Sequence, residues 1–172
     1  MSNAKNGAVQ IVFDANLWLN IALAVHPFHA QASQLLGDCL ASGVEIIAPA
    51  LWEVEADSSL RMMRVRKEIN RRAELAAQQL LNAAPVRVEW EPRLRLEAQR
   101  IADQLKHPRV YDATYVALAH LHGCELWTAD ERLFNAAQAV HTSFASGRKS
   151  VAAPLVLVRF IGSYAGEYAP LK

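Results

Sequence analysis

Two aspartates, Asp112 and Asp130, flank a stretch of the chain that is otherwise typical of a protein interior. Between them lie a helix-like segment that ends near Leu121 and a short strand-like segment, CELWT. Removing an ionised carboxylate from water costs several kcal/mol unless hydrogen bonds, a cation or a metal ion compensates for the lost hydration. The position of these acids therefore indicates a site where carboxylates have a chemical task, and cation binding is one such task.

The elements that would position these acids are short apolar strands alternating with helices. Strands are expected at residues 8–13, 44–49, 86–90, 124–128 and 155–161. Helical patterns fill the gaps, most clearly at residues 29–43, 71–84 and 93–105, and residues 141–150 are expected to form a longer loop. Alternation of this kind predicts a parallel sheet with helices on both faces. We therefore expect a three-layer α/β/α domain with a central parallel β-sheet of four to five strands.

This architecture would place several acids at one edge of the sheet. In open parallel sheets, ligands bind outside the carboxyl ends of the strands. Asp14 directly follows the first strand, and Asp130 lies two residues after Thr128, where the fourth strand ends. Asp112 lies near the start of the helix before that strand, and its neighbours one and two turns along are aromatic or apolar. All three carboxylates are therefore expected to point toward the same edge.

The helix expected after residue 49 offers a choice between two further acids. The residues one turn away from Glu55 are apolar or small, which indicates an inward-facing position. Glu53 has another acid, Asp57, at i+4, which indicates a solvated face. We predict that Glu55 is the inward carboxylate and keep Glu53 as the alternative.

Four segments resemble, in the same order, the four motifs of the PIN domain, and they are most similar to those of the VapC-type ribonuclease toxins: VFDANLWLN, APALWEVEADSSL, YDATYVALA and LWTAD. Together with their connections these segments extend over nearly the whole chain. The third and fourth motifs are the more specific, and the ordered set of four carries the resemblance.

The resemblance also assigns residues to a metal site. Four acids match the family's catalytic and metal-binding carboxylates: Asp14, Glu55, Asp112 and Asp130. Two polar residues match positions beside the metal: Asn16 and Thr128. Mg²⁺ and Mn²⁺ prefer hard oxygen ligands, so the resemblance implies Mg²⁺- or Mn²⁺-dependent hydrolysis of RNA phosphodiester bonds. A fifth acid found in some relatives has no clear counterpart in this chain other than Glu131. The resemblance therefore leaves open whether the site holds one metal ion or two.

A basic segment, RMMRVRKEINRR, offers a surface for a nucleic acid. It carries six cations against one acid, although the formal net charge of the whole chain is only +1: Arg61, Arg64, Arg66, Lys67, Arg71 and Arg72. Such side chains bind phosphates without reading sequence, so we predict that they contact an RNA backbone. Pairing with acids on a solvated helix is the alternative for each of them. Four further arginines could extend the surface: Arg93, Arg95, Arg100 and Arg109.

Composition narrows the remaining possibilities. The near-neutral charge gives no global attraction to nucleic acids or membranes, no apolar run is long enough to span a bilayer, and the N-terminus lacks the pattern of a signal peptide. Cys39 and Cys124 are expected as buried thiols in a reducing compartment. We expect a cytoplasmic protein in which residues 1–7 are an expression-derived or disordered extension and residues 8–172 form one domain.

Three classes of function are compatible with these features. The resemblance favours the endoribonuclease toxin of a type II toxin-antitoxin system, and it implies a structured substrate such as tRNA or rRNA, a cognate antitoxin and a homodimer. The second class is a PIN-fold RNA-binding or RNA-processing protein that is not a toxin. The third is a metal-dependent phosphatase, which usually has a second aspartate two residues after the first, where this chain has Asn16.

Overall fold

The computed structural model describes residues 9–106, 109–145, 156–166 and 168, and these residues confirm the predicted fold class. Five strands, all parallel, form one sheet in the order β3-β2-β1-β4-β5. Their bounds are β1 (Gln10–Phe13), β2 (Glu45–Pro49), β3 (Val86–Glu89), β4 (Glu125–Thr128) and β5 (Val158–Phe160). The extension predicted for residues 1–7 lies outside the described residues, and so does the start of the predicted fifth strand at Leu155.

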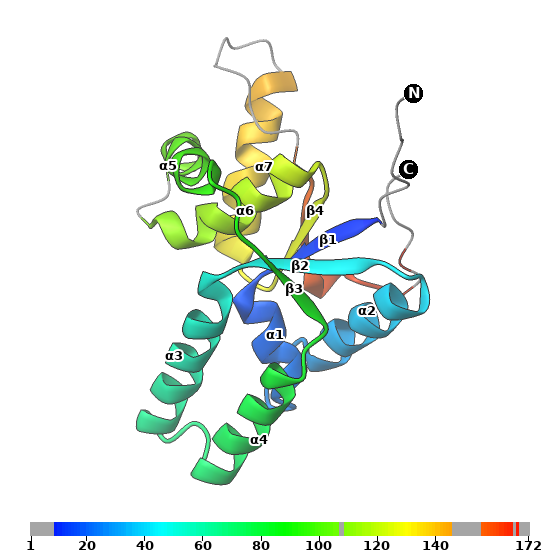
Figure 1. Ribbon diagram of the computed structural model, residues 1–172, viewed down its shortest axis with the longest axis vertical. Coiled ribbons are helices and arrows are strands. Elements are labelled where there is room, and N and C mark those ends of the chain that lie inside the picture. Colours follow the sequence, from blue (N-terminus) through cyan, green and yellow to red (C-terminus); the bar gives the residue numbers. More distant parts are fainter. Residues whose placement is uncertain (1–8, 107–108, 146–155, 167, 169–172) are drawn as a thin grey trace.

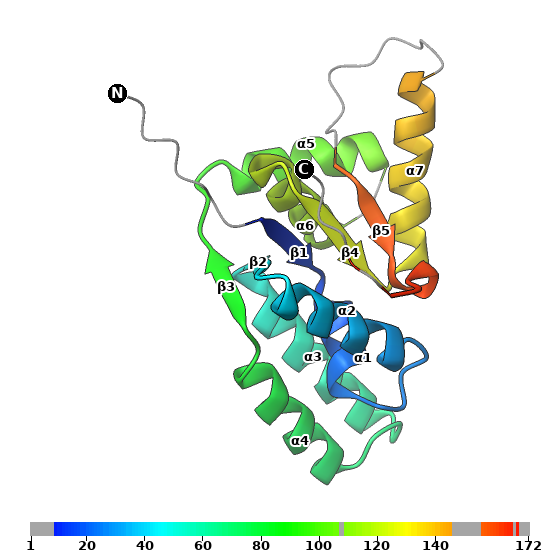
Figure 2. The ribbon, with the colours of Figure 1, turned by 90° about the vertical axis from the view of Figure 1, so that its right-hand side faces the viewer.

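Helices cover both faces of the sheet (Figure 1). They are α1 (Ala15–Ala22), α2 (His29–Ala41), α3 (Leu51–Val65), α4 (Arg71–Asn82), α5 (Leu94–Leu105), α6 (Val110–His122) and α7 (Glu131–Ala145), with a short 3₁₀ turn, η1 (Ile161–Ser163). Figures 1 and 2 show α5, α6 and α7 on one side of the sheet and α1 and α2 on the other. Helices α3 and α4 form a hairpin that extends past the sheet (Figure 1). None of the described helices is long and apolar enough to cross a membrane.

One predicted element is wrong. Residues 141–145, expected in a loop, continue α7 to Ala145, and the rest of that predicted loop lies outside the described residues. Serine, threonine and glycine suggested a loop, but propensity is a weak guide that helix continuation and tertiary packing override.

Strand β1 lies at the centre of the sheet and positions the first acid. Ile11, Val12 and Phe13 are fully buried, as expected for a parallel strand covered on both faces. Phe13 pairs in register with Trp127 of β4, and the N–H of Asp14 donates to the carbonyl of Trp127 at 3.1 Å. The residues that follow β1 and β4 therefore lie side by side at the carboxyl edge.

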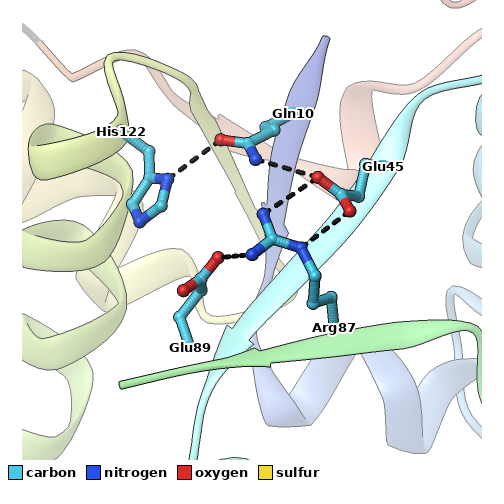
Figure 3. A network of polar contacts seen from close by, with 5 residues as sticks. All are labelled: Gln10, Glu45, Arg87, Glu89 and His122. Atoms are coloured by element: carbon cyan, nitrogen blue, oxygen red, sulfur yellow. Dashed lines mark hydrogen bonds and ion pairs between the residues drawn. The ribbon is translucent and has the colours of Figure 1, made fainter. Parts of the chain in front are cut away.

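A polar network joins three strands to the end of α6 (Figure 3). Arg87 of β3 donates to both carboxylate oxygens of Glu45 on β2, at 2.7 and 2.9 Å, and also pairs with Glu89. Glu45 accepts a 2.9 Å hydrogen bond from Gln10 of β1, whose Oε1 lies 2.9 Å from Nδ1 of His122. Because a slip of one residue would turn these side chains to the other face, the network helps to fix the strand register.

A buried ion-pair cluster holds the α3–α4 hairpin together. Glu74 of α4 is only 2% exposed, and its Oε2 lies 2.7 Å from Nε of Arg64 on α3 and 2.7 Å from Nη1 of Arg71. Asn70 caps α4 by accepting a 2.9 Å hydrogen bond from the N–H of Ala73. Two cations of the basic segment are thus engaged with a carboxylate inside the hairpin.

We expect Glu74→Gln to lower the melting temperature by several degrees at neutral pH, because it leaves two guanidinium groups beside a buried neutral amide. The hydrogen bond from Arg71, and then that from Arg64, holds the pKa of Glu74 below its usual value. This stabilisation is present above the unfolded-state pKa and is lost as pH falls through the folded-state pKa, so the difference between parent and variant should shrink in acid. Thermal unfolding followed by circular dichroism measures both effects.

The matched control is Glu53→Gln on the same hairpin, which changes an exposed glutamate and should leave the melting temperature nearly unchanged. Equal melting temperatures for the parent and Glu74→Gln at neutral pH would contradict this role for the cluster.

Candidate active site at the carboxyl edge of the sheet

Asp14 is a carboxylate almost completely removed from water. It is 2% exposed, directly follows β1 and caps the start of α1, where it accepts a 3.4 Å hydrogen bond from the N–H of Asn16. Its second oxygen accepts from Nδ2 of Asn16 at 2.8 Å and from the hydroxyl of Thr128 at 2.7 Å. Both carboxylate oxygens therefore have hydrogen-bond donors, and these donors are all electrically neutral.

Asn16 and Thr128 link the end of β1 to the end of β4. The side-chain oxygen of Asn16 accepts a 2.8 Å hydrogen bond from the N–H of Ala129. The hydroxyl oxygen of Thr128, which is fully buried, accepts a 2.9 Å hydrogen bond from the N–H of Asp130. The structure thus places both residues in direct contact with Asp14.

Glu55 reaches the same region from α3 through a tyrosine of α6. The hydroxyl of Tyr115, which is fully buried, donates a 2.7 Å hydrogen bond to Oε2 of Glu55. Glu55 is half-buried, whereas the alternative acid, Glu53, is exposed. Tyr115 is one of the aromatic or apolar neighbours expected along the helix from Asp112, and its contact with Glu55 was not predicted. The available signal was a tyrosine on a buried helix face, whose hydroxyl needs a hydrogen-bond partner.

Three of the predicted acids influence one another's ionisation. Burial raises the pKa of Asp14 from its usual 3.8 to about 7; the hydrogen bond from Thr128 opposes this, and the negative charges of Glu55 and Asp112 add to it. Burial also raises the pKa of Glu55. The hydrogen bond from Tyr115 lowers this pKa, and the negative charge of Asp112 raises it further. Asp112 lies half-buried in the first turn of α6. These three carboxylates form an electrostatically coupled group.

Asp130 is connected to this group in a different way. Its backbone N–H donates to Thr128, but its carboxylate caps α7, where Oδ1 accepts from the N–H of Arg132 at 2.8 Å and of Leu133 at 3.3 Å. The structure therefore brings Asp14, Glu55 and Asp112 within electrostatic range and attaches Asp130 to the same network through its backbone.

The coupled acids have the donor chemistry of a hard-cation site. Carboxylate and amide oxygens are the ligands that Mg²⁺ and Mn²⁺ prefer, and within the described residues the hydrogen-bond donors that contact Asp14 and Glu55 carry no positive charge. In the described part of the chain, no three histidine, cysteine, aspartate or glutamate side chains surround one point closely enough to hold a metal ion. The residue types nevertheless fit such an ion.

The basic segment divides into two groups. Arg64 and Arg71 form ion pairs with Glu74, which is the alternative to RNA contact that the sequence left open for each of these cations. The remaining four cations are exposed on the α3–α4 hairpin: Arg61, Arg66, Lys67 and Arg72. Of the arginines that could extend the surface, Arg93 pairs with Glu91 at 3.1 Å and Arg100 pairs with Glu97 at 3.1 Å.

Comparison with known proteins agrees with this fold. The family model of the PIN domain matches residues 11–139, and the chain belongs to the PIN domain family. PIN domains are generally nucleases, and they typically use divalent metals. The match extends from β1 into α7 and contains all four predicted acids.

Two solved structures share the fold. PAE2754 from Pyrobaculum aerophilum is 21% identical, with a TM-score of 0.55, and the match covers 81% of this chain and 99% of that one. VapC20 from Mycobacterium tuberculosis, a toxin that cleaves the Sarcin-Ricin loop, is 20% identical, with a TM-score of 0.51 and coverage of 83% and 99%. A comparison with curated proteins gave no match.

The raised pKa of Asp14 has a consequence for stability in the absence of metal. Between pH of about 4 and about 7, the folded state binds a proton that the unfolded state has released, because the pKa rises from 3.8 to about 7 on folding. The unfolding free energy should therefore decrease as pH rises through this interval, by up to roughly 4 kcal/mol. Asp14→Asn removes the titration, so its stability should depend less on pH.

Urea unfolding in chelator, repeated across this interval, measures the difference between the two proteins. Asp103→Asn, which changes an exposed aspartate of α5, should keep the pH dependence of the parent. If the parent and Asp14→Asn showed the same pH dependence, Asp14 would not be the buried acid described above.

Proposed function

We propose that this protein is a divalent-metal-dependent endoribonuclease that hydrolyses phosphodiester bonds in RNA. The observation that carries the proposal is the buried carboxylate of Asp14. Burial and the charges of Glu55 and Asp112 raise its pKa, and its hydrogen-bond donors are neutral. A cation at this edge would attract all three carboxylates and so offset the repulsion among them. Membership of the PIN family supports the same chemistry.

Each residue of the site has a distinct proposed role. Mg²⁺ or Mn²⁺ would be held by four acids: Asp14, Glu55, Asp112 and Asp130. When bound, such an ion acidifies the attacking water and neutralises charge that develops on the phosphate. Asn16 and Thr128 fix the orientation of Asp14, since both donate to its Oδ2. Tyr115 does the same for Glu55.

The exposed surface and the likeness to VapC20 support further proposals about the substrate and the protein partners. We propose a structured RNA substrate of the tRNA or rRNA class, bound in part through the exposed cations of the α3–α4 hairpin. We also propose a toxin role in the cytoplasm, with a cognate antitoxin and a homodimer. Apolar side chains exposed on the hairpin offer contact surface for such partners: Val54 at 69%, Val65 at 64% and Leu80 at 56%.

Cleavage of total cellular RNA tests the proposed reaction. The parent should cut RNA with Mg²⁺ or Mn²⁺ and should lose this activity in chelator. Asp14→Asn keeps the size of the side chain but removes a charge from the acid group, so cleavage should fall by at least tenfold. Glu53→Gln removes an exposed acid of the same region and should retain parental activity. Parental cleavage by Asp14→Asn, or by the parent in chelator, would rule out the metal-nuclease proposal.

Binding of RNA tests the role of the exposed cations. In the Asp14→Asn background, measured in chelator so that the RNA stays intact, the added pair Arg66→Ala and Arg72→Ala should weaken RNA binding. Each lost phosphate contact should also reduce the slope of log affinity against log salt by about 0.7 for single strands. Fluorescence anisotropy across a salt series measures both quantities. Arg100→Ala changes an arginine paired with Glu97 and serves as the control; an unchanged slope for the double variant would place the RNA elsewhere.

A further inference from the structure

A cavity of about 370 Å³ opens where β2 and β3 end, at the same edge of the sheet as the acids. Its wall is built from segments that are far apart in the sequence, and most of the side chains that form it are apolar: Leu51, Trp90, Pro92, Leu94, Ala98 and Val110. This volume is near the lower end of the range for small-ligand pockets, about 300–1,000 Å³. The cavity is therefore suited to one compact group rather than to an extended peptide.

Trp90 is the unusual member of this wall. Its side chain is 83% exposed, whereas Trp18, Trp52 and Trp127 are 2%, 3% and 7% exposed. An indole ring normally buries most of its surface, so one left open in the wall of a cavity offers a flat face for another ring. Stacking of this kind is available to every nucleobase, because each base has a π-face, and it is worth about 1–3 kcal/mol per base.

Polar groups at the cavity suit the other parts of a nucleotide. Arg95 of α5 lines the cavity, is exposed, and has no ion pair among the described residues, in contrast to Arg87 and Arg93. An unengaged guanidinium at the rim of an apolar cavity is suited to a phosphate. Glu89 also lines the cavity and is held by Arg87 (Figure 3), so its carboxylate can accept a hydrogen bond from a base amino group.

The cavity and the acids share two helices. Leu51 of the wall begins α3, and Glu55 lies one turn further along the same helix. Val110 and Thr114 of the wall belong to the first two turns of α6, which also carries Asp112. The cavity and the acid group are therefore neighbours along both helices.

We propose that this cavity binds one unstacked nucleobase of the RNA substrate, stacked on Trp90, with a neighbouring phosphate on Arg95. The inference rests on the proposed ribonuclease function and adds the substrate feature that it recognises, an unpaired base beside the cleaved bond. Duplex RNA cannot supply such a base without unstacking it.

Quenching of tryptophan fluorescence by acrylamide tests the proposal directly, because Trp90 is exposed while the other three tryptophans are buried. The full-length Asp14→Asn protein is titrated with mixed-sequence single-stranded RNA and, in parallel, with duplex RNA. Single-stranded RNA should protect the quenchable tryptophan, and duplex RNA should protect it less. Trp90→Ala should weaken single-stranded binding by about tenfold, and Trp90→Phe should restore most of it. Leu96→Ala, which alters a side chain of α5 that is 66% exposed outside the cavity wall, should bind as the parent.

The possible outcomes separate this inference from the proposed function. If RNA binds by anisotropy but Trp90 stays quenchable, the base-binding site is wrong while cleavage by the parent still supports the ribonuclease. If protection rises with protein concentration in the absence of RNA, a second copy of the chain covers Trp90, and the proposal is overturned. If the parent neither binds nor cleaves RNA, the ribonuclease and the base-binding site fail together.

Discussion

Burial of the Asp14 carboxylate is the constraint on which this edge of the molecule depends. The three residues before Asp14 form the end of the central strand and are fully buried, and the Asp14 side chain itself is almost completely buried. Thr128 and Asn16 supply neutral hydrogen bonds, yet the pKa still rises to about 7. The fold thus tolerates a costly acid at a fixed position, which is a common property of functional sites.

The parallel topology brings the amino termini of several helices to the same edge of the sheet. These termini offset only part of the cost of burying the Asp14 carboxylate. Asp14 caps α1, Asp130 caps α7, and Asp112 lies in the first turn of α6. A helix amino terminus stabilises a nearby carboxylate by about 0.3–1 kcal/mol, less than the several kcal/mol that desolvation costs. The remaining imbalance, together with the repulsion among Asp14, Glu55 and Asp112, is what a divalent cation would remove.

Sequence alone was sufficient where the determining pattern was local. The apolar runs before Asp14 and Asp130 gave the strand ends, and the neighbours of Glu55 distinguished it from exposed Glu53. Contacts between distant segments were not predictable from such patterns. The hydrogen bond from Tyr115 to Glu55 spans 60 residues, and the pairing of Arg64 with Glu74 depends on how two helices pack. Asp130 fits both a helix cap and a metal ligand, because the same local sequence serves either role.

The most direct measurement is a crystal structure grown with Mn²⁺ and analysed by anomalous scattering. The account predicts a manganese peak at the carboxyl edge of the sheet, ligated by Asp14 and by at least one of Glu55 and Asp112. Crystals with millimolar Mn²⁺ that show no peak at Asp14, or a peak held by other residues alone, would contradict the central claim.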